Sequence, residues 1–275
     1  MGALLLTAAL GPSLGVSQRA VRTAGKDVWL LVDISRSMDA PDVAPSRLLR
    51  TQAELRALVA QFPADRLGVV AFGAEAVMQC PLTYDQEAVL TFLATLRTGL
   101  LPPGPTTLRA PLELVLARLS AAPAPVPLAT ATLPRATALV IVSDGEDFGE
   151  NLESTLRVLA RTGARVYPVG VGTLVGSRIP TADGFILDGR GQPALTRLRE
   201  APLLQLAAQT GGQYFALNNQ ANGFEPLLRT LQAMQGPAEQ VRTVAVADNR
   251  YRYPLTAALL LLTLDIILTV TIIRP

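Results

Sequence analysis

Short, continuous apolar runs alternate along the chain with segments whose apolar residues recur at helical spacing. The WLLV run at 29–32 is apolar at every position, which is typical of strands covered by helices on both faces. The strand-like runs span 27–35, 66–73, 76–83, 136–144, 164–172 and 212–217, and the helical segments span 47–62, 86–96, 111–119, 152–162, 202–211 and 224–234. This alternation predicts an α/β fold with a doubly wound, mostly parallel sheet.

Two stretches interrupt the alternation. Residues 120–135 are rich in Ala and Pro, which disfavours both a helix and the hydrogen-bonded pairing of a β-strand. We therefore expect an exposed extended loop there. Residues 173–198 contain Gly184, Gly189 and Gly191 as turn points and predict an excursion of short hairpin strands.

The C-terminal segment reads LTAALLLLTLDIILTVTII over 255–273. At about 1.5 Å of helical rise per residue, it is long enough to cross most of a hydrocarbon core about 30 Å thick. A buried core helix is the alternative, but no polar residue repeats at helical spacing. We therefore predict a transmembrane helix over 254–273. Asp265 should face a partner helix or stay protonated, because an ionised carboxylate there costs about 2.5 kcal/mol or more.

The chain divides on this pattern into an apolar N-terminal stub with a basic linker, a globular domain, a juxtamembrane linker and the span, at 1–24, 25–236, 237–253 and 254–273. The stub lacks a basic leading region and is broken by Gly11 and Pro12, which argues against a signal peptide. It resembles the end of a membrane helix, as if Met1 were a misassigned start. Basic residues are more frequent on the domain side of the span, which favours a cytoplasmic domain in the cell membrane.

Composition excludes several functions. The 24 basic and 22 acidic residues are scattered without a basic stripe, so nucleic acid is not an expected partner. The chain has no His and a single Cys, Cys80, which excludes zinc sites built from Cys and His and triads that use an imidazole. No phosphate-binding loop of the GxxxxGK[ST] type is present. We predict that the protein is not an enzyme.

The candidate chemistry lies in oxygen side chains at the ends of predicted strands. Asp33-Ile-Ser35-Arg-Ser37 directly follows the apolar strand VWLLV at 28–32, and ligands bind at that edge of open α/β sheets. Thr106, chosen over Thr107, and Asp144 come from loops at the same predicted edge. These hard oxygens suit Mg²⁺, or alternatively Mn²⁺ or Ca²⁺. Taken singly, each motif also fits an ordinary turn or helix cap.

Acidic residues follow Asp144 at Glu146, Asp147 and Glu150. We expect them to stabilise the start of the next helix through its dipole, with a second metal site as the less favoured alternative.

The DxSxS motif, the later Thr and the later Asp resemble the metal-ion-dependent adhesion site of von Willebrand factor A domains, over about 27–234. The strings SRSM, DVAPSRL, GVVAFG, QCPLT, SDGED, VGVGT and TGGQYF resemble bacterial Bat-type (aerotolerance-operon) membrane proteins. The resemblance implies that Ser35, Ser37 and Thr106 bind a metal by hydroxyl. It implies that Asp33 and Asp144 act directly or through water, and that an open coordination position accepts a partner's Asp or Glu carboxylate. Relatives often carry GGT where this chain has Gly-Pro-Thr.

Two functions follow from the resemblance. The first is a membrane-anchored binding module that works with a MoxR-type AAA+ ATPase and sister von Willebrand factor A proteins. The alternative is a non-catalytic subunit of an ATP-dependent, metal-chelatase-like enzyme complex. Autonomous metal-dependent hydrolysis is disfavoured because the sequence offers no general base of the usual kind.

Overall fold

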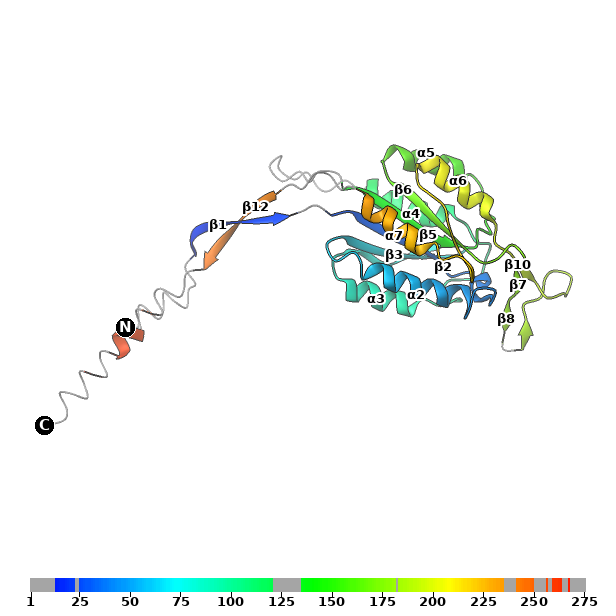
Figure 1. Ribbon diagram of the computed structural model, residues 1–275, viewed down its shortest axis with the longest axis horizontal. Coiled ribbons are helices and arrows are strands. Elements are labelled where there is room, and N and C mark those ends of the chain that lie inside the picture. The colour runs from blue at the N-terminus through cyan, green and yellow to red at the C-terminus, as the bar shows by residue number, and fades with distance from the viewer. Residues whose placement is uncertain are drawn as a thin grey trace. The chain divides into compact units, whose positions relative to one another are not determined.

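The computed structural model describes residues 13–22, 25–120, 135–181, 183–234, 241–249, 256, 259–263 and 267. The chain splits into two compact units (Figure 1). The terminal unit comprises Met1–Thr23 with Glu239–Pro275, and the globular unit comprises Ala24–Ala238.

A six-stranded sheet forms the centre of the globular unit, in the order β11-β6-β5-β2-β3-β4. All neighbours run parallel except β3 and β4, which are antiparallel. The strands are β2 (Asp27–Asp33), β3 (Arg66–Phe72), β4 (Ala76–Thr83), β5 (Thr137–Ser143), β6 (Arg165–Val171) and β11 (Phe215–Leu217). The predicted doubly wound, mostly parallel sheet is confirmed.

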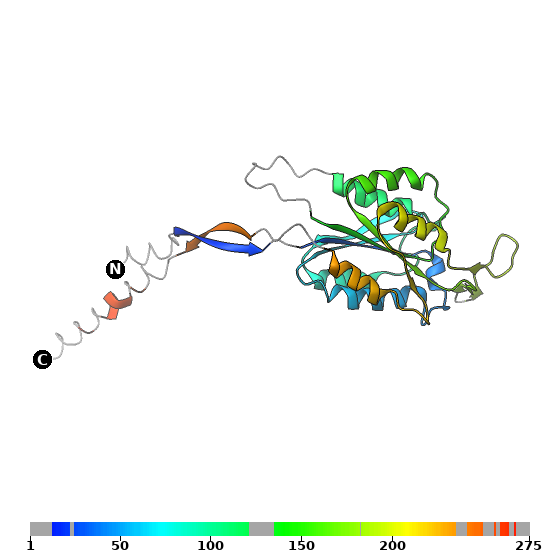
Figure 2. The ribbon, with the colours of Figure 1, turned by 45° about the horizontal axis from the view of Figure 1, so that its top comes forward.

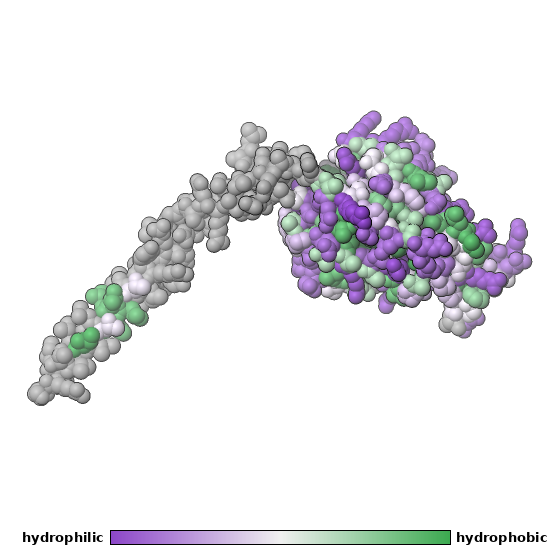
Figure 3. All heavy atoms as spheres, viewed as in Figure 1, coloured by the Kyte–Doolittle hydropathy of each residue, from purple (hydrophilic) through white to green (hydrophobic). Residues whose placement is uncertain are grey.

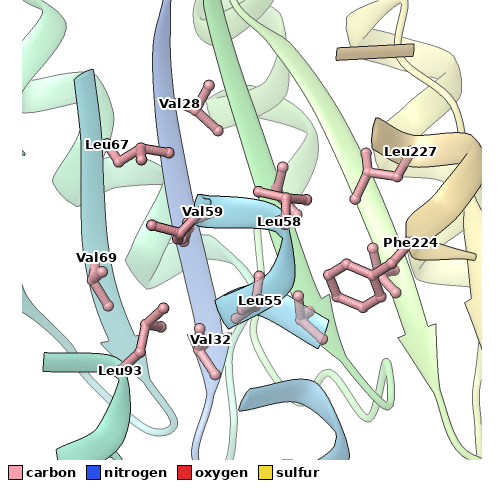
Figure 4. Packing of buried hydrophobic residues seen from close by; sticks show 14 of the residues in the cluster. Val28, Val32, Leu55, Leu58, Val59, Leu67, Val69, Leu93, Phe224 and Leu227 are labelled. Carbon is pink, nitrogen blue, oxygen red and sulfur yellow. The ribbon is translucent and has the colours of Figure 1, made fainter. Parts of the chain in front are cut away.

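Helices cover both faces of this sheet (Figure 2). Strand β2 is buried on both faces because successive side chains point to opposite sides: Val28 and Val32 enter one core, and Trp29 and Leu31 enter the other. Figure 4 shows the first core, where Val28 and Val32 lie among residues of α2 and α7. Helices α2 (Arg47–Val59), α3 (Gln86–Thr95) and α7 (Phe224–Ala233) pack on that face, and α4 (Arg109–Ser120), α5 (Leu152–Arg161) and α6 (Glu200–Thr210) pack on the other.

The excursion after β6 consists of short antiparallel pairs, as predicted. Strand β7 (Ser177–Arg178) pairs with β10 (Leu195–Thr196), and β8 (Pro180–Thr181) pairs with β9 (Gly184–Phe185). Most of the loop predicted at 120–135 lies outside the described residues. On the face shown in Figure 3, the surface of the globular unit is mostly hydrophilic, and its hydrophobic residues form small separate patches.

Both regions that we expected to be linkers contain a strand. Strand β1 (Ser13–Arg22) pairs antiparallel with β12 (Val241–Asn249). A period-two signal was present in the sequence, because apolar and polar residues partly alternate in GVSQRAV and VRTVAVAD. The two segments flanking the globular domain are therefore joined by a ladder.

The predicted span at 254–273 lies mostly outside the described residues, as does Asp265. Within it, residues 256, 259–263 and 267 are helical. Among the described residues, no helix combines the length and apolarity needed to cross a membrane. Residues 1–12, which include most of the predicted apolar N-terminal stub, are also outside the described part of the chain.

Candidate metal centre

The candidate site lies at the topological switch point of the sheet, where strands are added first on one side of β2 and then on the other. From β2 the chain adds β3 and β4 on one side, and it then adds β5, β6 and β11 on the other. In doubly wound sheets this switch point leaves a crevice at the carboxyl ends of the two central strands. Asp33 is the last residue of β2, and Asp144 directly follows β5. Both acids therefore flank the crevice.

Asp33 organises the turn that carries the two serines. Its carboxylate is fully buried and accepts hydrogen bonds from the Ser35 N–H (2.9 Å) and from the Ser143 hydroxyl (2.6 Å). The chain then enters the short 3-10 helix η1 (Arg36–Asp39), which brings the Ser35 and Ser37 Oγ atoms within 2.9 Å of each other. Two hydroxyl oxygens this close can converge on one ligand.

Thr106 joins the serines from the loop before α4. Thr106 lines the same cavity as Ser35 and Ser37. Thr107 has a different role, because its Oγ1 accepts a hydrogen bond from the Arg109 N–H (3.2 Å) at the start of α4. The structure thus brings Thr106, and not Thr107, together with the two serines.

Asp144 lies beside a guanidinium that sequence reasoning missed. The Arg47 side chain is fully buried, and its Nη1 donates to Asp144 Oδ2 at 2.9 Å. The other oxygen of Asp144 accepts the Glu146 N–H at 3.1 Å, and Thr196 Oγ1 lies 3.3 Å from Oδ2. The negative charge of Asp144 is therefore already partly compensated by the positive charge of the Arg47 side chain.

Arg47 also ties the site to the excursion after β6. Its Nε and Nη2 donate hydrogen bonds to the two carboxylate oxygens of Asp42, each at 2.8 Å, and Nη1 donates to Thr196 Oγ1 at 3.0 Å. Asp42 in turn accepts the backbone N–H of Thr173 at 2.9 Å. A sequence signal existed, because Arg47 occupies the first turn of α2, where a positive charge opposes the helix dipole.

Burial and neighbouring charge shift the pKa values of these acids. Burial, together with the nearby charge of Asp144, raises the pKa of Asp33 to about 7, although hydrogen bonds from Ser143 and Ser35 oppose the rise. Burial would also raise the pKa of Asp42, but the Arg47 guanidinium and Thr173 hold it below its ordinary value. Burial, followed by Asp144, raises the pKa of Glu146. Negative charge is therefore costly around Asp33 without a cation.

The donor set fits a hard divalent cation. It offers the hydroxyls of Ser35, Ser37 and Thr106 and two buried carboxylates, all of which are hard oxygen donors. The raised pKa of Asp33 marks a place where a cation would relieve the cost of a buried negative charge.

The alternative second metal site finds no support in the described part of the chain, where no group of three or more His, Cys, Asp or Glu residues is placed to hold an ion. Asp147 Oδ1 instead accepts the Leu108 N–H (3.2 Å) beside the start of α4, an earlier helix than the one we predicted. Glu146 Oε1 accepts from Thr196 and from the Arg197 N–H in the excursion. Of the three acids for which we expected this role, Glu146 and Asp147 therefore bond to other segments than the start of the following helix, and the role of Glu150 stays a prediction.

Comparisons with known proteins agree with this architecture. Residues 28–146 match the family model described as von Willebrand factor type A domain. A structure of BatB from Bacteroides thetaiotaomicron is similar at a TM-score of 0.67 and 25% identity, over 76% of this chain and 98% of that one. An aerotolerance-related membrane protein from Bacteroides fragilis is similar at a TM-score of 0.66 and 27% identity, over 76% of this chain and all (100%) of that one.

A shorter match joins the chain to an uncharacterized protein of Borreliella burgdorferi, at 34% identity over 89 residues, or 32% of this chain. The match spans about a quarter (26%) of that relative's length.

Proposed function

We propose that this chain, which carries a von Willebrand factor type A domain similar to those of Bat-type proteins, binds one divalent cation and uses it to hold a carboxylate of a protein partner. The observation that carries the proposal is the convergence of Ser35, Ser37 and Thr106 on one cavity, beside two buried carboxylates at the switch point of the sheet.

The ligands have distinct roles in this proposal. Ser35, Ser37 and Thr106 line the cavity and would hold the cation through their hydroxyl oxygens. Asp33 and Asp144 lie fully buried and would neutralise it directly or through water. Bound there, the cation would supply an electrophilic position that accepts an anionic oxygen from outside.

Arg47 sharpens this preference for a carboxylate. Its guanidinium lies 2.9 Å from Asp144, so part of the negative charge of that acid is already compensated. Asp33 is then the only one of the two acids whose negative charge is fully available to balance the +2 charge of the cation. A cation held this way is under-neutralised and gains from a further anionic ligand.

Titration calorimetry of Mg²⁺ and Mn²⁺ into the full chain, in a mild detergent, tests the proposal. We expect saturable binding that disappears in Asp33→Asn, which keeps the shape of the side chain and removes its charge. Asp39→Asn is the matched control, because Asp39 lies in η1 and bonds Thr98 instead of the site. Equal binding by all three proteins would place the ion elsewhere and refute the proposal.

The membrane anchor and the partners form the second part of the proposal. One similar structure is of a protein described as an aerotolerance-related membrane protein, and the segment at 254–273 has the length and apolarity of a span. We propose that this segment anchors the chain, with the globular domain on the cytoplasmic side. The partners would be a MoxR-type AAA+ ATPase and sister von Willebrand factor A proteins, and the domain would act by binding without catalysing a reaction. Protease accessibility in sealed vesicles tests the sidedness.

A further inference from the structure

A cavity of about 400 Å³ opens directly beside the three candidate metal hydroxyls. Ser35, Ser37 and Thr106 form one part of its lining. Its volume falls in the range of about 300–1,000 Å³ that is usual for ligand pockets. A single carboxylate bound to a cation would occupy only a small part of this space, so the cavity can accept more of a partner than its acidic group.

The rest of the lining is largely apolar and comes from separate segments of the chain. Leu101 belongs to the proline-rich loop before α4, and Phe148 follows β5. Ile179 and Ile186 belong to the excursion after β6. Apolar walls next to charged or polar groups are typical of sites in which the polar groups fix orientation and the walls supply affinity.

The charged side chains in the lining favour an acidic occupant. Arg36 lies between the two serines, is exposed, and has no ion pair among the described residues. Glu146 is the acid in the lining, and its Oε1 is engaged by Thr196 and by the Arg197 N–H. The basic side chain is therefore free to meet a partner, whereas the acidic one is already bound.

We propose that the cavity recognises a segment of a protein partner in which a branched apolar side chain stands next to the metal-binding carboxylate. The carboxylate would meet the hydroxyl edge and Arg36, and the apolar side chain would lie against Leu101, Ile179 and Ile186. The inference rests on the proposed function and deepens it, because it makes the neighbour of the acidic residue a determinant of specificity.

Blocked dipeptides test the inference by calorimetry with the full chain in saturating Mg²⁺. The probes are N-acetyl-Asp-Leu-amide, the reversed Leu-Asp peptide, N-acetyl-Asp-Gly-amide and N-acetyl-Asn-Leu-amide. Of the Asp-Leu and Leu-Asp peptides, the one that binds more tightly should bind at least about tenfold more tightly than the Asp-Gly peptide, because it buries most of a leucine side chain. The Asn-Leu peptide should not bind measurably, and chelation of the metal should abolish binding of every peptide.

A matched pair of variants locates the apolar contact. Ile186→Ser should remove most of the tenfold preference and leave the affinity for Mg²⁺ unchanged. Leu187→Ser is the control, because Leu187 is the adjacent residue, is 60% exposed and does not line the cavity. It should keep both the preference and the metal affinity.

The outcomes separate this inference from the proposed function. Metal and carboxylate binding without any preference for leucine would overturn the inference and leave the proposed function standing. A preference that survives Ile186→Ser would place the apolar contact outside the cavity and also overturn it. Failure of Mg²⁺ to bind would refute the proposed function itself. Mg²⁺-dependent self-association that Ile186→Ser abolishes, measured by sedimentation, would assign the cavity to a second copy of the chain instead.

Discussion

The buried guanidinium of Arg47 makes the electrostatics of the site testable through stability. In Arg47→Met, a side chain of similar reach remains, but the charge that serves Asp42 and Asp144 is lost. The side chains of those two acids are 6% and 0% exposed, so water cannot replace the guanidinium. Removing one partner of a buried ion pair costs about 3–5 kcal/mol. We expect a loss of that size in the free energy of unfolding when no divalent cation is present.

Mg²⁺ should reverse part of this loss. In Arg47→Met a bound cation no longer competes with a guanidinium 2.9 Å from the Asp144 carboxylate. Relief of a repulsion of about 1.4 kcal/mol tightens binding tenfold. We therefore expect Mg²⁺ to stabilise the variant more than the wild type. Arg47→Lys should fall between the two proteins, because an ammonium keeps the charge but cannot grip Asp42 with a planar fork.

The assay is urea denaturation of the full chain with and without Mg²⁺, followed by the fluorescence of Trp29. This residue is the only tryptophan in the chain and is 2% exposed in β2. Arg56→Met is the control on the same helix, because Arg56 is exposed and its loss should change stability by about 0.5 kcal/mol or less. The reasoning is refuted if Arg47→Met is as stable as the wild type without metal, or if Mg²⁺ stabilises both proteins equally.

Four further results are expected. Ser37→Ala should weaken Mg²⁺ binding about tenfold or more, because a ligand hydroxyl is lost, while Thr107→Ala should leave Mg²⁺ binding unchanged. Calorimetry that finds the reverse would place Thr107, and not Ser37, in the metal site. Because the pKa of Asp33 is about 7 in the metal-free protein, Mg²⁺ affinity should rise up to tenfold per pH unit from pH 5 to pH 7 and then level off. Between pH 3.8, the ordinary pKa of an Asp side chain, and pH 7, Asp33 binds its proton more tightly in the folded protein than in the unfolded chain. The free energy of unfolding of the metal-free protein should therefore fall as the pH rises through this window. Mg²⁺ affinity and metal-free stability that do not change with pH would contradict this role of Asp33. Gly172→Ala should destabilise the fold by about 1–3 kcal/mol, because φ is +133° and a Cβ would meet the Arg47 guanidinium at 3.0 Å, whereas Gly189→Ala should be neutral in thermal denaturation.

Local sequence patterns predicted the sheet and the edge at which the candidate site residues lie, because the relevant signals are close together along the chain. Asp33 at the end of β2 and Ser35 and Ser37 just after it lie within five residues, and the edge of the sheet at which they lie follows from the strand alone. Arg47 escaped prediction because its partner Asp144 lies 97 residues away, and no local pattern pairs them. The same reason hid the ladder between β1 and β12, whose strands come from opposite ends of the chain.

Thr106 shows where a local signal was present but insufficient. Two adjacent threonines precede α4, and both are hydroxyl residues within one short segment of the sequence. The choice depends on backbone contacts outside the motif: Thr107 N–H donates to Gly73 O at 2.9 Å, and Thr106 O accepts the Phe148 N–H at 2.9 Å. These contacts hold the loop against β3 and the segment after β5, which brings Thr106 into the same cavity as the serines.

The most direct test of the central claim is diffraction from crystals of the full chain grown with Mn²⁺, recorded where manganese scatters anomalously. The account predicts one anomalous peak in contact with the Ser35, Ser37 and Thr106 hydroxyls, with Arg47 still bound to Asp42. Saturating Mn²⁺ with no peak among these hydroxyls, or a peak held by other residues, would contradict it.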